Sequence, residues 1–133
     1  MITHKDYALH AQFYRRGIDL PVHAINVLRR AQMTLHRWNE LECGDGNDYA
    51  SWSIERDEST GIPYLCTYPY NGKMRRHRIA DREAGALKRI QSICAEHGLS
   101  YYHQTDPRGC ALYISRETLH DDSYSSHGLA CCL

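Results

Sequence analysis

The sequence lacks the long apolar segments that would place a protein in or across a membrane. No apolar run approaches the roughly 20 residues that a membrane-spanning helix requires, and the first ten residues, MITHKDYALH, contain no apolar signal-peptide core. An excess of charge of one sign is also missing, because 16 lysines and arginines balance 16 aspartates and glutamates. We therefore expect a cytoplasmic protein that does not bind membranes.

The ligand spacings of common metal sites are absent as well. Among six cysteines there is no C-x-x-C pair, and the adjacent Cys131 and Cys132 would point to opposite faces of a strand. Only Cys94 and His97 have a spacing that a helix could use for chelation. The calcium-loop pattern D-x-D-x-D-G is not matched by the acidic run of Glu40, Glu42, Asp45 and Asp48. We expect no metal, no cofactor and, without a secretory context, reduced cysteines.

What is present is the patterning of one α+β domain. At 133 residues the chain fits a single domain, with an N-terminal segment over 1–18 and a core over 19–133. The N-terminal segment is interpreted as a short helix that stops at Gly17. A longer helix is predicted from Pro21 to about Leu41, because one apolar stripe recurs every three or four residues at Ala24, Leu28, Ala31, Leu35 and Trp38.

A three-strand meander and a further helix are predicted next. The strands are Tyr49 to Arg56, Ile62 to Tyr68 and Lys73 to Ile79. Their turns are Ser59-Thr60-Gly61 and Asn71-Gly72, of which the second is the strongest two-residue hairpin signal. The helix runs from Asp81, which can cap it, to His97, and Gly98 ends it. Its apolar stripe is Ala84, Leu87, Ile90 and Cys94.

The C-terminal third predicts a β-hairpin and a last strand. Two alternating apolar runs in Leu99 to Ser115 flank Asp106-Pro107-Arg108-Gly109, whose residue types suit a tight turn. The tail from Ser126 to Leu133 echoes the second of these runs and predicts a strand that pairs near the hairpin. The expected fold is therefore α+β: an antiparallel sheet with two main helices packed on one face.

The clearest candidate binding surface is the basic strand. Residues 71–90 hold seven bases and two acids, whereas residues 40–58 hold seven acids and one base, so the two segments could also face each other. Lys73, Arg75, Arg76 and Arg78 could contact phosphates, and in the neighbouring strand bases could stack on Tyr64, Tyr68 and Tyr70. The alternative is an edge strand whose charges prevent self-association.

The hairpin tip offers a second candidate site. Arg108 could engage a phosphate or carboxylate while Asp106 orients it, with Tyr101, His103 and Thr105 projecting beside the tip from the incoming strand. The alternative is a simple turn with a solvated arginine. An enzymatic interpretation would use His103, Asp106, Arg108 and Cys110, but Cys110 begins an apolar strand, where a cysteine usually behaves as a small hydrophobe.

Two resemblances accompany these patterns. The segment YYHQTDPRGCALYISRE and the later GLACC resemble small uncharacterised proteins of tailed phages and prophages over about the last 35 residues. The resemblance is carried chiefly by Tyr102, Asp106, Pro107, Arg108, Gly109, Ala111, Leu112 and Tyr113. It implies a phage accessory protein in a host cell, from a family that has no established catalytic residues. The α-β-β-β-α order of residues 21–97 is similar in architecture to a double-stranded RNA-binding domain, but the helix that begins Ala80-Asp81-Arg82-Glu83 lacks that family's lysine-rich start.

The sequence thus favours a non-enzymatic phage accessory protein that binds a macromolecule, either a nucleic acid or a host protein. The binding residues would be those of the basic strand and the hairpin tip. The competing hypothesis is a small hydrolase or transferase with its site around the tip. Catalysis would need the tip residues to converge in a cleft, whereas a binding protein can present them on an open face.

Overall fold

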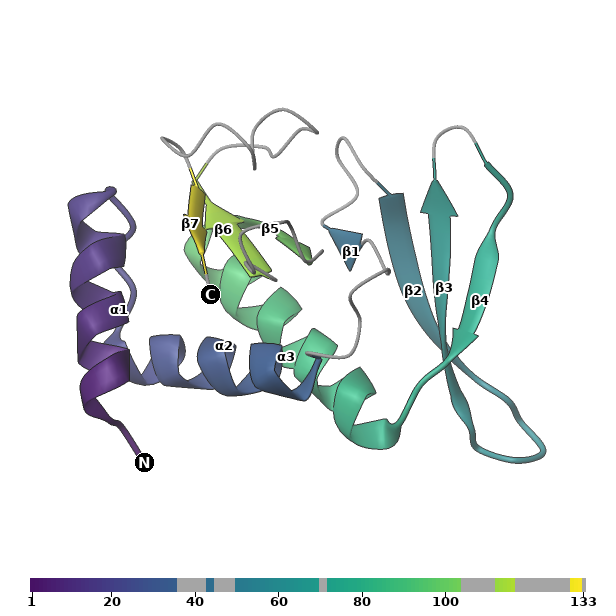
Figure 1. Ribbon diagram of the computed structural model, residues 1–133. Helices are drawn as coiled ribbons and strands as arrows, with labels where there is room; N and C mark the ends of the chain where they lie inside the picture. Colours follow the sequence, from purple (N-terminus) through teal and green to yellow (C-terminus); the bar gives the residue numbers. More distant parts are fainter. Residues whose placement is uncertain (36–42, 45–49, 70–71, 104–111, 117–129, 133) are drawn as a thin grey trace.

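The computed structural model describes residues 1–35, 43–44, 50–69, 72–103, 112–116 and 130–132 (Figure 1). These residues form an α+β fold, as predicted. The helices are α1 (His4–Arg15), α2 (Val22–Thr34) and α3 (Asp81–His97). The strands are β1 (Cys43–Gly44), β2 (Ala50–Arg56), β3 (Pro63–Pro69), β4 (Arg75–Arg78), β5 (Ser100–His103), β6 (Leu112–Ser115) and β7 (Ala130–Cys132).

The strands form two antiparallel sheets. The predicted meander is confirmed as a three-stranded sheet in the order β2-β3-β4. The predicted C-terminal hairpin is confirmed by the pairing of β5 with β6, and the predicted last strand by the pairing of β7 with β6. With β1 these strands form a second sheet in the order β1-β5-β6-β7. The turn tetrad Asp106–Gly109 and the turn residue Asn71 lie outside the described residues.

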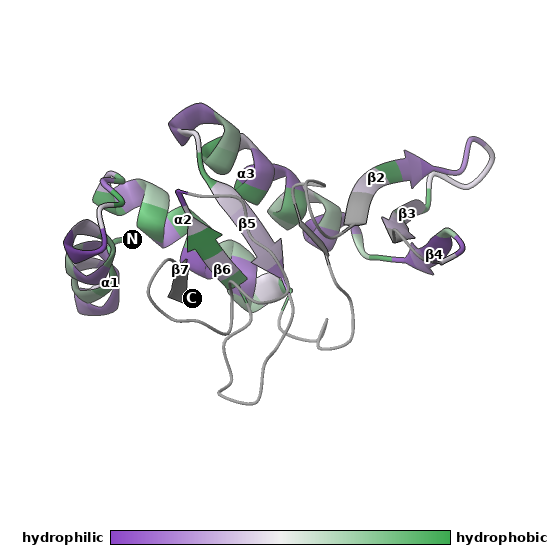
Figure 2. Ribbon diagram, turned by 90° about the horizontal axis from the view of Figure 1, so that it is seen from above, coloured by the Kyte–Doolittle hydropathy of each residue, from purple (hydrophilic) through white to green (hydrophobic). Residues whose placement is uncertain are grey.

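The two main helices pack against each other and support the four-stranded sheet. The α2 stripe is buried as predicted at Ala24, Leu28, Ala31 and Leu35, and so is the α3 stripe at Ala84, Leu87, Ile90 and Cys94. The sheet of β5, β6 and β7 lies over these helices, whereas the meander stands to one side, beyond the start of α3 (Figures 1 and 2). In Figure 2, β6 is hydrophobic and β4 hydrophilic, so the main core lies under the four-stranded sheet.

Helix α2 is shorter than predicted. The apolar stripe led us to expect a helix to about Leu41, but α2 ends at Thr34. The Thr34 hydroxyl donates a hydrogen bond to the Arg30 carbonyl oxygen at 3.1 Å, and the Leu35 N–H reaches both the Ala31 and Gln32 carbonyls, which tightens the last turn. Hydrophobic periodicity includes Leu35 in the apolar stripe, but it does not show that the helical hydrogen-bond pattern ends at this residue.

The start of α3 also differs in detail from the prediction. Asp81 was expected to cap the helix, but it is the first helical residue, and Ala80 occupies the N-cap position. The Ala80 N–H is satisfied by the Glu83 carboxylate at 2.7 Å. Asp81 instead forms an exposed ion pair of 2.7 Å with Arg56 at the end of β2. At the other end, Gly98 ends the helix as predicted, in the left-handed conformation with φ of 66°.

A buried charge network fixes α1 to α2. The Asp6 side chain is fully buried and accepts hydrogen bonds from the Thr3 N–H (2.8 Å), the Asn26 amide (2.8 Å) and Arg29 Nε (2.7 Å). The bond and charge of Arg29 hold the pKa of Asp6 well below its usual range, despite the opposing effect of burial. Because the carboxylate is fully partnered, it tolerates a position without solvent and fixes how the two helices cross.

Candidate nucleic-acid interface

The basic run is confirmed as an edge strand with two chemically different faces. In the register of the meander, Arg76 lies opposite Cys66 and Arg78 opposite Tyr64, so both arginines share a face with the even-numbered residues of β3. Arg75 lies opposite Thr67 on the other face. That other face is directed at the core, because it carries the buried Leu65 and the buried Thr67.

The outward face combines tyrosines with arginines, and we call Tyr64, Tyr68, Arg76 and Arg78 the tyrosine–arginine face. The Arg76 guanidinium carbon lies 3.7 Å from the centroid of the Tyr64 ring, a cation–π geometry. Tyr68 is 40% exposed, and both arginines are exposed. No described helix covers this side of the meander (Figures 1 and 2).

Cys66 lies between Tyr64 and Tyr68 on the same side of β3. Although Cys66 points outward in the strand register, it is fully buried. Burial raises the pKa of its thiol, and the nearby Glu55 carboxylate raises it further. The thiol is therefore protonated at neutral pH and has no role as a nucleophile.

Two other cations of the basic run differ from Arg76 and Arg78 in their setting. Arg75 is exposed but belongs to the core-directed face of β4. Lys73 precedes the strand and is exposed. Among the tyrosines, Tyr70 lies outside the described residues. The predicted group of four cations is thus divided by the sheet, and only Arg76 and Arg78 share the tyrosine side.

Residues expected beside the hairpin tip are placed differently. Tyr101 and His103 were predicted to project next to an exposed tip, but both are buried in β5, with 4% and 1% exposure. The Tyr101 hydroxyl accepts a hydrogen bond from Trp52 Nε1 at 2.8 Å, which joins the two sheets through side chains. Tyr101 therefore has a structural role. Asp106 and Arg108 lie outside the described residues.

The structure does not place His103, the base of the enzymatic interpretation, in contact with solvent. Burial lowers the pKa of His103 to about 4, so its imidazole is neutral at physiological pH and withdrawn from solvent. Cys110 lies outside the described residues. No group of three His, Cys, Asp or Glu side chains suited to a metal ion occurs in the described part of the chain. Cys94 is buried in the core whereas His97 is exposed, which separates the pair with chelating spacing.

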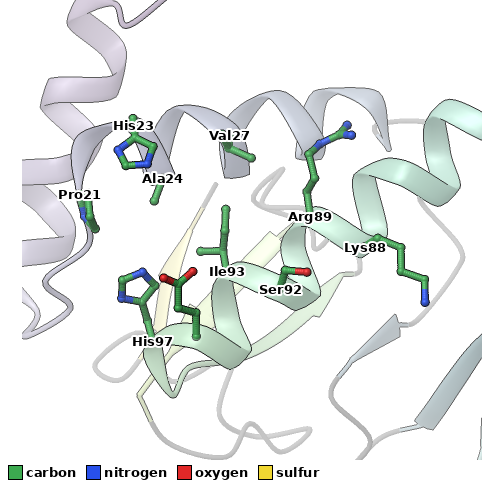
Figure 3. Close-up of a pocket in the computed structure, with 10 residues that line it drawn as sticks. Pro21, His23, Ala24, Val27, Lys88, Arg89, Ser92, Ile93 and His97 are labelled. Atoms are coloured by element: carbon green, nitrogen blue, oxygen red, sulfur yellow. The ribbon is translucent and has the colours of Figure 1, made fainter.

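Two surface grooves were not predicted from the sequence. The first, of about 430 Å³, lies between α2 and α3 (Figure 3). Its aliphatic floor includes Val27 and Ile93, and it has histidines from both helices at one end. The second, of about 580 Å³, is lined by Met1, Thr3, Arg29, Arg30, Met33, Thr34 and Arg82. Its arginines come from segments some 50 residues apart, so no local pattern could have brought them together.

Comparisons with protein-family models, curated proteins and solved structures found no match. The resemblance to tailed-phage proteins therefore stays a prediction, and most of the residues that carry it lie outside the described ones. No helix among the described residues is both long and apolar enough to cross a bilayer. The function must be inferred from the chemistry of the surface itself.

Proposed function

We propose that this protein is a non-enzymatic binding protein for single-stranded nucleic acid, which lies across the tyrosine–arginine face. The observation that carries the proposal is the pairing of Arg76 with the Tyr64 ring on an open sheet face beside the exposed Tyr68. Aromatic rings on such a face can stack on bases, and neighbouring cations can contact the phosphates between them.

The local charge of the interface favours an anionic partner. The chain as a whole is neutral, but residues 72–80 contain four lysines and arginines and no aspartate or glutamate. Among the described residues of the interface, Glu55 is the acid that opposes these cations, and it lies on β2, at the far edge from β4.

Single strands suit this surface better than duplexes. Stacking needs bases that can be turned outward, and each stacked base contributes about 1–3 kcal/mol. In a duplex the faces of the bases are stacked inside the helix, so they could not stack on the exposed Tyr68. A host protein is the other class of partner for a mixed aromatic and basic surface, and it becomes the better interpretation if nucleic acid does not bind.

The first test separates stacking from general charge attraction. Tyr68→Leu keeps an apolar side chain but removes the ring, so we expect affinity for oligothymidine to fall about tenfold, with little change in its salt dependence. Tyr14→Leu, which removes a 64% exposed ring from α1, serves as the matched surface control. Binding by fluorescence anisotropy at several salt concentrations gives both quantities.

The second test uses the two faces of β4. Arg76→Gln should reduce the slope of log K against log salt by about 0.7, the value for one phosphate contact on a single strand. Arg75→Gln removes the same charge from the other face and should leave the slope almost unchanged. Equal effects of both variants, or no binding by the unaltered protein at low salt, would refute the proposed interface.

A further inference from the structure

We propose that the groove lined by Arg29, Arg30 and Arg82 is a second phosphate-binding site, which receives the nucleic-acid backbone where it leaves the tyrosine–arginine face. This inference rests on the proposed function. It assigns a role to a groove that β4 does not line and that no local motif encodes. It also predicts that the bound strand extends beyond the sheet.

The arginines of this groove differ in how their charges are balanced. Arg29 is held by the buried Asp6, at 2.7 Å from Nε to the carboxylate, and its Nη1 contacts Met33 sulfur at 3.5 Å. The charge of Arg29 is therefore neutralised by Asp6, and its side chain is held in place along one side of the groove. The side chains of Arg30 and Arg82 are exposed, and neither guanidinium group forms an ion pair or hydrogen bond with a residue that the structure describes. They supply two positive charges that no described acid balances.

Around these two cations the groove is suited to phosphate. Thr3 and Thr34 line it as well, but their hydroxyls already donate to Asp6 and to the Arg30 carbonyl, so the exposed arginines are the donors for a phosphate. Three acids next to the arginines of the groove are engaged elsewhere, since Asp6 binds Arg29, Asp81 pairs with Arg56 and Glu83 accepts from the Ala80 N–H. Planar guanidinium groups match the oxygens of a phosphate in two-point contacts. A groove of about 580 Å³ is large enough for a backbone segment.

Chain connectivity brings the groove within reach of the sheet. Arg78, the last residue of β4, precedes Arg82 by four positions, so their Cα atoms lie at most about 14 Å apart. Both flank the junction from which α3 begins (Figure 1). A strand that contacts Arg78 can therefore continue past Arg82 toward Arg30 without a long gap in positive charge.

The test compares a short and a long oligothymidine, of about four and about twelve nucleotides. The short one is expected to occupy only the tyrosine–arginine face, and the long one both sites. In the double variant Arg30→Gln/Arg82→Gln, the salt slope for the long oligonucleotide should fall by about 1.4, two contacts of 0.7 each. Binding of the short oligonucleotide should not change. Arg15→Gln/Lys88→Gln, which removes two exposed cations from elsewhere, is the matched control.

The outcomes separate this inference from the proposed function. If Tyr68→Leu weakens binding but Arg30→Gln/Arg82→Gln behaves like the control with the long oligonucleotide, the interface stands and the second site is refuted. Equal losses with both oligonucleotides also refute it, because they indicate diffuse attraction. If the unaltered protein binds neither oligonucleotide, both proposals fail. Thermal unfolding of each variant checks that the exposed substitutions leave the fold intact.

Discussion

The buried imidazole of His103 should make the stability of this protein depend on pH in a defined window. In the unfolded chain a histidine has a pKa near 6.5, whereas burial lowers the pKa of His103 in the fold to about 4. The folded state thus favours the neutral form. Its stability is complete above pH 6.5 and is lost as the pH falls toward 4, because the unfolded chain binds the proton first.

The size of the effect follows from the two pKa values. Their difference of about 2.5 units corresponds to about 3 kcal/mol in full, of which about 2 kcal/mol is lost between pH 8 and pH 5. Urea unfolding across this range gives the free energy of unfolding directly. His103→Leu should remove this component, so that the loss between the two pH values is smaller by about 2 kcal/mol.

A measurement on the unaltered protein guards against a variant that does not fold. The NMR titration of the His103 ring should show no protonation above about pH 5. Protonation near pH 6.5 in the folded state would refute the reasoning, because the imidazole would then be in contact with solvent. So would an unchanged pH dependence in a folded His103→Leu variant.

Three further predictions concern residues that stabilise the fold or are buried in it. Asp6→Asn should lower the free energy of unfolding by about 3 kcal/mol, measured in urea, because it leaves Arg29 without its buried partner; a loss below about 0.5 kcal/mol would contradict the role given to the network. Gly98→Ala should cost about 1 kcal/mol, since alanine is strained at the left-handed end of α3, and an unchanged melting temperature would argue against that conformation. The buried thiols of Cys66 and Cys94 should resist thiol reagents in the folded protein, and a count of six thiols is expected after denaturation; fewer than six would indicate disulfides.

Local patterns predicted the elements well because their determinants are local. The alternation around Gly61 and the stripe of Leu87 and Ile90 encode a turn and a helix within a few residues. Gly61 indeed takes a φ of 73°, and the Asp57 carboxylate caps the same turn through the Ser59 N–H at 2.9 Å. The end of α2 was missed because the apolar stripe, which includes Leu35, does not show where the backbone hydrogen bonds of the helix stop.

The candidate interface was predictable only in composition. The sequence places tyrosines and arginines in neighbouring strands, but which arginines share the tyrosine side depends on strand register, which is not local. The same limit explains Tyr101. Alternation correctly placed it on a strand, but its burial is a matter of long-range packing in the core, and its hydroxyl is bonded to Trp52, 49 positions earlier. The division of the strands into two sheets is likewise a matter of long-range packing.

The separation of the strands into two sheets affects how the protein unfolds locally. The described strands share no backbone hydrogen-bond ladder between the two sheets, and the Trp52–Tyr101 contact connects them through side chains. We therefore expect the meander to unfold as one cooperative unit, with loss of the Leu65 packing in the core, while the helices and the other sheet stay folded. Amide protons of β2, β3 and β4 should exchange with solvent as a group, ahead of those in β5 and β6. A bound nucleic acid strand would slow that exchange in the meander first.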